Sequence, residues 1–356
     1  MKKYYLRFKR KDINNALTKA VDDCETILQT LGYQEKSLFM FRKNRFFKAL
    51  LWIKELIQLF LIPKSSIVVI QHPAYIKQDY MKVIKSLKKV KQTVLVFIIH
   101  DLESVRHMVL NNGERYTKRD EQMLGLADYL ICHNDHMIEL LASQGIDRRK
   151  MISLDFFDYL SSNGEDSQEG IPKANDEGII IAGNLDPRWC EYIYTSMDEI
   201  NVPINLYGVN FNKEIADKRT NYYGEFDPDT LIRVMKGKFG LVWYGNSLDK
   251  CGEGNVEHYL YYINPHKVSA YAAAGIPVIV GDNIGSAEFV CKNEIGIAIH
   301  SIRDLRKTLE SVSEDKYNTY KQNVLNLQQK IVKGHFLRSA INKCEKRIEE
   351  SDERKY

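Results

Sequence analysis

Two short apolar runs flank an Ala-rich segment in the second half of the chain, and this pattern restricts the fold more than any other feature. The runs at residues 239–243 and 276–280 have the length and composition of buried parallel strands. The segment 268–274 between them predicts a helix, because Pro265 stands near its start and Gly275 can adopt the positive φ that ends a helix. The order strand, helix, strand is typical of an α/β sheet.

The same alternation runs through the rest of the chain. Further runs that predict strands lie at residues 4–8, 67–70, 94–99, 129–132, 151–154, 178–182, 204–207 and 296–299. Helical segments separate them, so we expect an α/β fold built from two Rossmann-like, doubly wound sheets. In such sheets ligands bind beyond the carboxyl ends of the strands.

A chain of 356 residues suits two domains. Residues 161–177 are polar, acidic and glycine-containing, which is typical of a linker. We therefore predict an N-terminal domain at residues 1–160 and a C-terminal domain at 178–330. Residues 331–356 predict a C-terminal helix that can pack back on the N-terminal domain.

The net charge of +4 conceals an asymmetry between the two halves. Residues 1–150 hold 27 Lys and Arg against 16 Asp and Glu, a net charge of +11, and the remainder carries −7. A basic first half can face an acidic membrane or a phosphorylated substrate, or it can be a solvated lysine-rich surface. A nucleic-acid partner is not expected, because no aromatic motif is interleaved with the basic residues.

Cysteine spacing and hydropathy indicate a cytoplasmic protein. The six cysteines show no CxxC spacing, which indicates reduced thiols rather than a zinc site, and the N-terminus lacks the apolar core of a signal peptide. The apolar stretch 46–63 is too short and too charged to span a bilayer. It predicts an amphipathic helix that packs in the core or lies on the inner face of the plasma membrane. Residues 50–61 are equally compatible with a homo-oligomer interface.

The start of the Ala-rich helix is the strongest candidate binding site. Lys267 stands at the helix entrance, and a helix N-terminus beside a lysine favours a phosphate group. Arg188 follows another predicted strand, in a loop at the same edge of the sheet. Two cations facing a diphosphate can stabilise a departing nucleotide without a metal.

Other motifs are absent or better explained by local structure. The chain has neither GxGxxG nor GxxxxGK[ST], which argues against a dehydrogenase and a P-loop protein. Asp227 and Asp229 form a DxD sequence, but Pro228 between them favours a turn and helix start. His133 and His136 lack an evident third metal ligand, so ordinary hydrogen bonds are expected for them.

Several segments resemble two related bacterial families. The segments are 98–106 (IIHDLESVR), 182–185 (AGNL), 206–210 (LYGVN), 239–243 (FGLVW), 259–267 (YLYYINPHK) and 274–279 (AGIPVI). They look like galactofuranosyltransferases of surface-polysaccharide synthesis and equally like glucosyltransferases that extend GlcNAc on serine-rich-repeat adhesins. The resemblance runs from about residue 94 to the end, and more weakly before it. It implies a GT-B fold whose domains face a central cleft, with a UDP-sugar donor bound mainly by the second domain, an acceptor bound mainly by the first, and no metal or cofactor.

The resemblance also implies roles for single residues in the second domain. It assigns Lys267 and Arg188 to the diphosphate, and it places Asn184, Tyr207, Trp243 and Ser269 around the nucleotide sugar. Ala270 departs from many GT-B enzymes, which have an acidic residue there for the ribose. Ribose binding would then fall to Ser269 or Glu288.

In the first domain the resemblance places His100 and Asp101 near the acceptor. An inverting transferase needs a general base for the acceptor hydroxyl. We predict Asp101 for this role, with His100 as the alternate. An equally weighted alternative is that Asp101 caps a helix that starts near Leu102.

The sequence therefore predicts a UDP-sugar-dependent hexosyltransferase, with UDP-galactofuranose as the first donor and a cell-surface glycan as acceptor. The first alternative is a UDP-glucose-dependent enzyme that acts on a glycoprotein adhesin. The second alternative is a non-catalytic GT-B subunit that stabilises an active transferase, against which the intact Lys267 and Arg188 argue.

Overall fold

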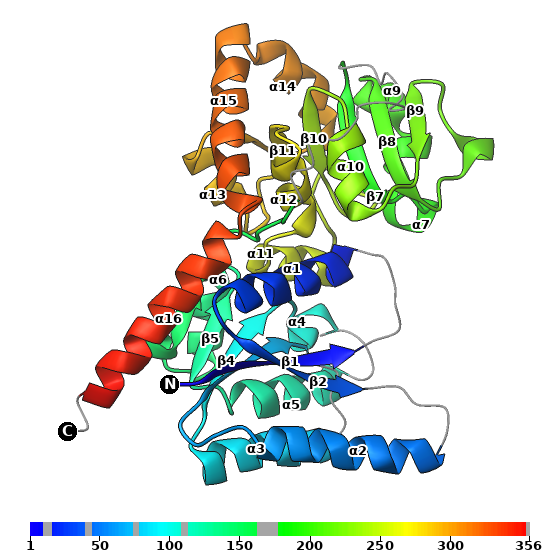
Figure 1. The fold of residues 1–356 in the computed structure, drawn as a ribbon. Helices are drawn as coiled ribbons and strands as arrows, with labels where there is room; N and C mark the ends of the chain where they lie inside the picture. The colour runs from blue at the N-terminus through cyan, green and yellow to red at the C-terminus, as the bar shows by residue number, and fades with distance from the viewer. Residues whose placement is uncertain (10–15, 40–44, 74–77, 108–112, 162–176, 354–356) are drawn as a thin grey trace. The chain divides into compact units, whose positions relative to one another are not determined.

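The computed structural model describes residues 1–9, 16–39, 45–73, 78–107, 113–161 and 177–353 (Figure 1). The chain divides into two compact units, which we call unit 1 (Met1–Leu154 with Phe336–Tyr356) and unit 2 (Asp155–His335). Each unit contains its own six-stranded sheet. Most of the linker predicted at residues 161–177 lies outside the described residues.

Unit 1 is built on a parallel sheet with the strand order β2-β1-β3-β4-β5-β6. Its strands are β1 (Lys3–Lys9), β2 (Gln34–Phe39), β3 (Ile67–His72), β4 (Val94–Ile99), β5 (Tyr129–Cys132) and β6 (Met151–Ser153). Every residue of β3 is buried, as expected for a central strand that is covered on both faces. The order reverses between β1 and β3, so the switch point of this sheet lies there.

Helices cover both faces of the unit 1 sheet (Figure 1). They are α1 (Ala16–Thr30), α2 (Arg45–Phe60), α3 (Gln78–Lys91), α4 (Glu103–Arg106), α5 (Gly113–Leu124), α6 (Asp135–Ser143) and α16 (His335–Glu353). The last of these, α16, is fixed to parts of unit 1 that are distant from it in the sequence. Glu345 pairs with Lys3 at 2.6 Å and accepts a hydrogen bond from the Tyr33 hydroxyl at 2.7 Å, and Arg347 donates to the carbonyl of Met151 at 2.9 Å. The C-terminal helix therefore belongs to unit 1.

Unit 2 is also built on a parallel sheet, with the order β12-β11-β10-β7-β8-β9. Its strands are β7 (Ile179–Asn184), β8 (Ile204–Val209), β9 (Thr220–Gly224), β10 (Phe239–Val242), β11 (Val278–Gly281) and β12 (Gly296–Ile299). The chain adds β8 and β9 on one side of β7 and then crosses to add β10, β11 and β12 on the other. This is the Rossmann order, and its switch point lies between β7 and β10.

The helices of unit 2 are mostly short. They are α7 (Pro187–Cys190), α8 (Tyr192–Thr195), α9 (Met197–Ile200), α10 (Pro228–Val234), α11 (Asn255–Tyr262), α12 (His266–Ala273), α13 (Ala287–Lys292), α14 (Leu305–Ser311) and α15 (Glu314–Ile331). The side chain of Asp227 accepts the N–H groups of Asp229 and Thr230 at the start of α10, which confirms that the DxD sequence is a turn and helix start.

The core of unit 2 explains the small residues that the sequence shows around α12. The ring of Tyr271 packs directly on Gly240 of β10, where a Cβ would stand 2.3 Å from the ring. The Tyr271 hydroxyl accepts the N–H of Ala182 at 2.9 Å and lies 3.3 Å from the carbonyl of Ile180. One buried side chain thus joins α12 to two neighbouring strands at the switch point, which fixes the position of the helix relative to the sheet.

Two strands escape the sequence analysis. The strands β2 and β9 both lie at the edge of a sheet and have polar sequences, QEKSLF and TNYYG. Edge strands need only one apolar face, so neither carries the apolar run that marks a central strand.

Across the described ranges, no helix is both long and apolar enough to cross a membrane.

Candidate functional site

The candidate site of unit 2 lies at the carboxyl edge of its sheet, beside the switch point between β7 and β10. The segment after β7 leads into α7, and the segment after β10 contains Tyr244 and Asn246. Asn246 ties the two together: its Oδ1 accepts the N–H of Glu191, and its Nδ2 donates to the carbonyl of Arg188. Ligands of doubly wound sheets bind at this position.

Lys267 lies at this edge, in the first turn of α12. Its side chain is half-buried, and its Nζ lies 4.9 Å from the centre of the Tyr244 ring. Its other polar neighbours are the thiols of Cys190 and Cys251, whose pKa values burial raises to about 11 and about 12. Within the described part of the chain no carboxylate pairs with Lys267. Burial accordingly lowers the pKa of its ammonium.

The surroundings of Lys267 favour an anionic ligand. A cation held in a partly desolvated position without a counter-ion is stabilised by any anion that reaches it. No side chain of the described residues caps α12, so its first N–H groups add a partial positive charge at the same place. Two hydrogen bonds hold the start of the helix in place: Ser269 donates to the carbonyl of Phe157, and Asn264 donates to that of Asp155.

Two glycines allow the backbone and the lysine to lie close together. A Cβ at Gly183 in β7 would stand 3.1 Å from Cε of Lys267, and the φ of Gly183 is +126°. Gly208 in β8 has φ +143°, and a Cβ there would stand 1.8 Å from the carbonyl oxygen of Gly183. The two glycines therefore allow the Lys267 side chain to lie against the backbone of β7, and the ends of β7 and β8 to lie against each other.

Replacing Gly208 with alanine should destabilise the protein strongly, because the added methyl group collides with backbone that cannot move aside. We expect a loss of about 2–4 kcal/mol in the free energy of unfolding, measured by chemical denaturation. Gly32→Ala is the control, since Gly32 also has positive φ (+83°) but no atom within 4 Å of the added Cβ. An equal loss in both variants would show that backbone strain, and not the contact with Gly183, sets the effect.

Arg188 lies in the same loop region but is already paired. Its guanidinium donates from Nε to Asp186 at 2.9 Å and forms a second bond from Nη2 to the same carboxylate. These bonds lower the pKa of Asp186 to about 2. The Arg188 side chain is exposed to solvent, so a phosphate would have to compete with Asp186 for it. Of the two predicted cations, Lys267 is therefore the stronger candidate for binding a phosphate.

The other predicted donor-site residues lie in two kinds of position. Asn184 is exposed at the end of β7, where its Oδ1 accepts the N–H of Asp186 and a hydrogen bond from Asn210. Tyr207, Trp243 and Ser269 are buried, and each uses its polar atom inside the unit. The Tyr207 hydroxyl accepts the N–H of Lys236, Trp243 Nε1 donates to the carbonyl of Ser247, and Ser269 makes the hydrogen bond described above. For these three side chains, burial argues against direct contact with a ligand.

In unit 1, His100 and Asp101 follow β4 as predicted, at the carboxyl edge of the sheet. His100 Nε2 lies 2.6 Å from Oε1 of Gln71. Asp101 is buried, and one of its oxygens accepts a hydrogen bond from Arg106 at 2.8 Å. The alternative that Asp101 caps a helix is wrong: the residue at the cap of α4 is Leu102, and the Asp101 side chain accepts no N–H group of that helix among the described residues. The other oxygen, Oδ1, has no hydrogen-bond partner among the described residues.

The structure also shows a pair of side chains at this edge, His72 and Asp120, whose contact the sequence does not indicate. Nε2 of His72, at the end of β3, lies 3.0 Å from Oδ1 of Asp120 in α5, and the second oxygen of Asp120 accepts the N–H of Ser104 at 2.7 Å. Glu103 is buried nearby, and burial raises the pKa of its carboxyl group although Arg119 lies 3.7 Å away. The carboxyl edge of unit 1 thus concentrates groups that can accept or hold a proton.

The two units together define a class of fold. Two doubly wound, Rossmann-like sheets in separate units are the architecture of the GT-B fold. HepE from Anabaena, crystallised with UDP and glucose, has a TM-score of 0.58 at 11% identity over 98% of this chain and 99% of its own. A putative UDP-N-acetylglucosamine 2-epimerase from Listeria monocytogenes has a TM-score of 0.55 at 11% identity, over 98% of each chain. At these identities the likeness shows the fold alone, and it confirms the predicted GT-B fold.

The sequence relatives show the family. Family models described as glucosyltransferase 3-like match residues 2–156 (N-terminal domain) and 179–344 (C-terminal domain). The β-1,6-galactofuranosyltransferase WbbI of Escherichia coli K12 is 31% identical over 249 residues, which are 69% of this chain and 70% of that protein. Glucosyltransferase 3 of Streptococcus gordonii is 22% identical over 78% of each chain. The chain belongs to the glucosyltransferase 3-like family and is a glycosyltransferase, so the resemblance found in the sequence is confirmed.

Proposed function

We propose that the chain is a UDP-sugar-dependent hexosyltransferase that transfers galactofuranose from UDP-galactofuranose to a glycan acceptor in cell-surface polysaccharide synthesis. The observation that carries the proposal is Lys267, a partly desolvated ammonium at a helix N-terminus beside the switch point of unit 2, with no carboxylate partner among the residues that the structure describes. A nucleoside diphosphate supplies the negative charge that this position lacks. The choice of galactofuranose rests on the relative that is 31% identical.

The residues of each unit then have separate tasks. In unit 2, Lys267 and the start of α12 hold the diphosphate and stabilise the charge that grows on it as the glycosidic bond to the sugar breaks. Arg188 adds a second cation once its bond to Asp186 is given up. In unit 1, Asp101 accepts the proton of the attacking acceptor hydroxyl, with His100 as the alternate. Asn184 is the exposed polar group beside the diphosphate position.

Two cations can neutralise the departing diphosphate, so we propose that transfer requires no bound metal. Turnover measured after treatment with EDTA should then equal turnover of the untreated enzyme. Loss of activity in EDTA that added Mg²⁺ or Mn²⁺ restores would contradict this proposal.

Two other functions stay open to the same test. A UDP-glucose-dependent enzyme that acts on a glycoprotein adhesin is supported by the relatives named glucosyltransferase 3. A non-catalytic GT-B subunit would have no need for an uncompensated lysine at the switch point, so Lys267 argues against it.

We place the enzyme in the cytoplasm, with access to the inner face of the plasma membrane, and homo-oligomers are compatible with this placement.

The test is release of UDP by the purified full chain from UDP-galactofuranose, UDP-glucose, UDP-galactose and UDP-GlcNAc. Selective release from UDP-galactofuranose is the expected result. Selective release from UDP-glucose would favour the adhesin-modifying alternative. Binding of UDP without release from any donor, with or without added glycan acceptors, would favour the non-catalytic alternative.

The affinity for UDP should fall with rising pH once the pH passes the lowered pKa of Lys267. Burial lowers the pKa of Lys267 in the free protein, whereas a bound diphosphate favours its ammonium form and raises that pKa again. Above the lowered pKa, binding must therefore take up a proton, and the affinity decreases with pH; below it, the affinity is constant. Calorimetric titrations of UDP between about pH 7 and 10 measure this, with Lys267→Arg as the control. The arginine variant should show a flat profile, and an equal slope in both would assign the effect to another group.

A further inference from the structure

Helix α2 is apolar on two sides, and only one of them is covered. Leu59, in the last turn of the helix, and Ile62, just after it, are buried against unit 1. Large apolar side chains also point into solvent, and they are Trp52, Ile53, Ile57, Phe60 and Leu61. They recur at spacings of four residues, so they form a continuous stripe along the helix. The exposed fractions reach 71% for Phe60 and 66% for Leu61.

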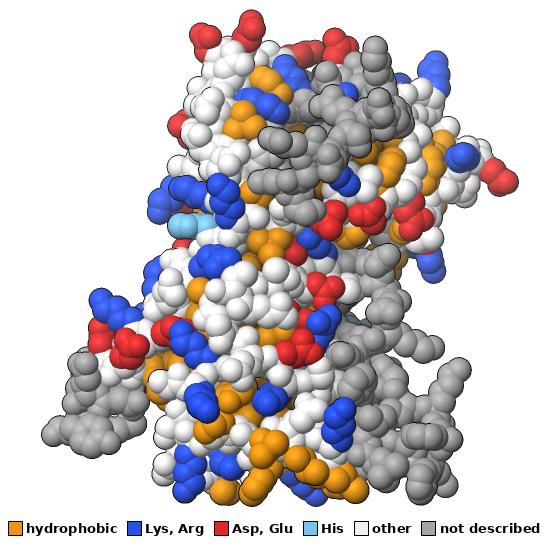
Figure 2. All heavy atoms as spheres, in the orientation of Figure 1, with side chains coloured by type: hydrophobic (Ala, Val, Ile, Leu, Met, Phe, Trp, Pro, Cys, Tyr) orange, Lys and Arg blue, Asp and Glu red, His pale blue; other side chains and the backbone are white. Residues whose placement is uncertain are grey.

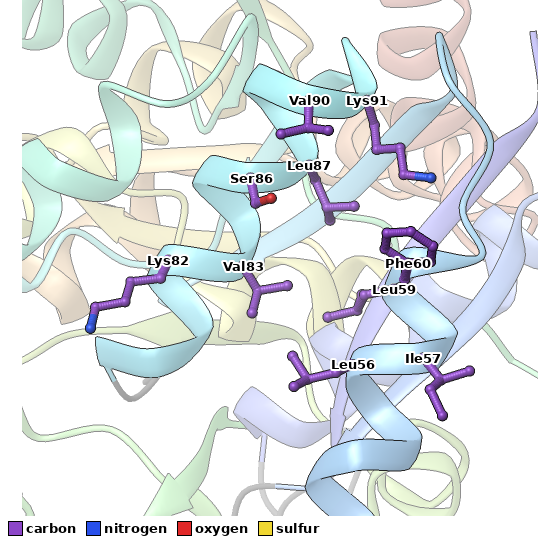
Figure 3. A pocket seen from close by; sticks show the side chains of 10 residues that line it. All are labelled: Leu56, Ile57, Leu59, Phe60, Lys82, Val83, Ser86, Leu87, Val90 and Lys91. Atoms are coloured by element: carbon purple, nitrogen blue, oxygen red, sulfur yellow. The ribbon is translucent and has the colours of Figure 1, made fainter.

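The stripe continues into a groove between α2 and α3 (Figure 3). Leu56, Leu59 and Phe60 of α2 face Val83 and Leu87 of α3 across a space of about 460 Å³. Ile57 and Val90 also line this space. Val90 is itself 61% exposed. In Figure 2, apolar side chains gather over α2 and α3 at the lower edge of the face shown, with Lys and Arg side chains beside them. We call this surface, which joins the stripe and the groove, the α2–α3 face.

The charge around the α2–α3 face is strongly positive. Residues 52–64 and 81–91 contain seven lysines, at positions 54, 64, 82, 85, 88, 89 and 91, and one acidic residue, Glu55. Glu55 is buried, and Lys88 pairs with Asp128 at 2.9 Å. The other six lysines form no ion pair within the described ranges of the chain. Lys82 and Lys91 line the groove itself, and Nζ of Lys91 lies 4.4 Å from the centre of the Phe60 ring.

We propose that the α2–α3 face binds the surface of an anionic membrane, with α2 lying in the plane of the interface. An apolar stripe with a rim of unpaired lysines matches a bilayer surface, where the apolar side chains enter the acyl boundary and the ammonium groups meet anionic headgroups. A second copy of the same face would bring two strongly positive surfaces together, so like charges oppose a symmetric dimer here. The proposal does not depend on the donor chemistry of unit 2.

The test is flotation of the purified full chain with phosphatidylcholine vesicles that contain about 30% phosphatidylglycerol, and with pure phosphatidylcholine vesicles. The protein should float with the anionic vesicles only, and about 1 M NaCl should release most of it, because salt screens the lysines. Failure to bind anionic vesicles at low salt, or equal binding to both kinds of vesicle, would overturn the proposal.

Paired variants separate the two parts of the face. Lys82→Glu with Lys89→Glu should lower the vesicle partition coefficient by about 25-fold or more, since each lysine near an anionic surface contributes about fivefold. Lys218→Glu with Lys307→Glu makes the same change in charge at exposed positions of unit 2 and should lower the partition coefficient much less. If both double variants lose the same amount of vesicle binding, the loss depends only on net charge, and the proposed site is overturned.

The apolar part is tested by Ile57→Ser with Phe60→Ser, which should also abolish flotation while UDP release stays at the wild-type rate. Ile215→Ser, at another exposed apolar position, is the control and should float normally. Sedimentation in the absence of lipid shows whether the face is instead a contact between two copies of the chain. A dimer that the double serine variant dissociates would identify the face as a contact between copies and overturn the membrane proposal.

Discussion

Replacing Lys267 with alanine should lower the turnover of the UDP-sugar by about 10²–10³-fold, which is the usual effect of removing one preorganised group that stabilises charge in the transition state. The diphosphate gains negative charge as the bond to the sugar breaks, and Lys267 has no carboxylate partner in the described part of the chain that would already neutralise its ammonium. Steady-state release of UDP from the preferred donor measures the effect.

Two further variants make the Lys267 result specific. Lys316→Ala removes an exposed lysine of the same unit that pairs with Glu294, and it should leave turnover unchanged. Lys267→Arg keeps the charge in a larger group and should recover part of the lost rate. If the Lys267→Ala enzyme turns over at the wild-type rate, the assignment of the diphosphate to Lys267 is contradicted.

Replacing Asp101 with asparagine should lower the rate of sugar transfer by about 10²–10⁴-fold, the range expected for loss of a general base. Asparagine has the shape of the aspartate and can still accept the hydrogen bond from Arg106, but it cannot take a proton from the acceptor hydroxyl. Because Asp101 belongs to unit 1, the affinity for UDP should not change. The rate is measured with a glycan acceptor, and UDP binding is measured by calorimetry on the same preparation.

The Arg106 contact distinguishes catalysis from structure. If Asp101 serves only to hold Arg106, then Arg106→Gln should reduce transfer as much as Asp101→Asn does. If Asp101 is the base, Arg106→Gln should have a much smaller effect. If both variants lose the same amount of transfer activity, Asp101 is not the base. The candidates for the base at this edge are then Glu103 and the His72–Asp120 pair.

The central strands of both sheets were predictable because burial on two faces requires continuous apolar runs. The central strands β4 and β5 begin and end at the predicted residues, and so does the edge strand β12, whose sequence GIAI is also apolar. The edge strands β2 and β9 were not predictable, since their polar sequences resemble loops and only pairing with a neighbour makes them strands. The strand order was also hidden, because nothing in the sequence of β10 shows that it crosses to the far side of β7.

The candidate site divides in the same way. The position of Lys267 followed from local sequence, since a proline, a helix start and a glycine stop lie within a dozen residues of one another. Tyr207, Trp243 and Ser269 also lie at or near the carboxyl edge, but only the packed structure shows that their polar atoms are used inside the unit. The His72–Asp120 pair carried no sequence signal, because its members are 48 residues apart and meet only when α5 packs beside the end of β3.

The central claim is that Lys267 contacts the phosphates of a bound nucleotide, and calorimetric titration of uridine, UMP and UDP into the wild type and Lys267→Ala tests it most directly. We predict that the wild type binds UDP more tightly than UMP and UMP more tightly than uridine. In the variant the UDP affinity should fall by about 10–100-fold, as expected for loss of a charged hydrogen bond, while the uridine affinity stays the same. An equal loss of affinity for uridine and for UDP, or no binding of UDP by the wild type, would contradict the account.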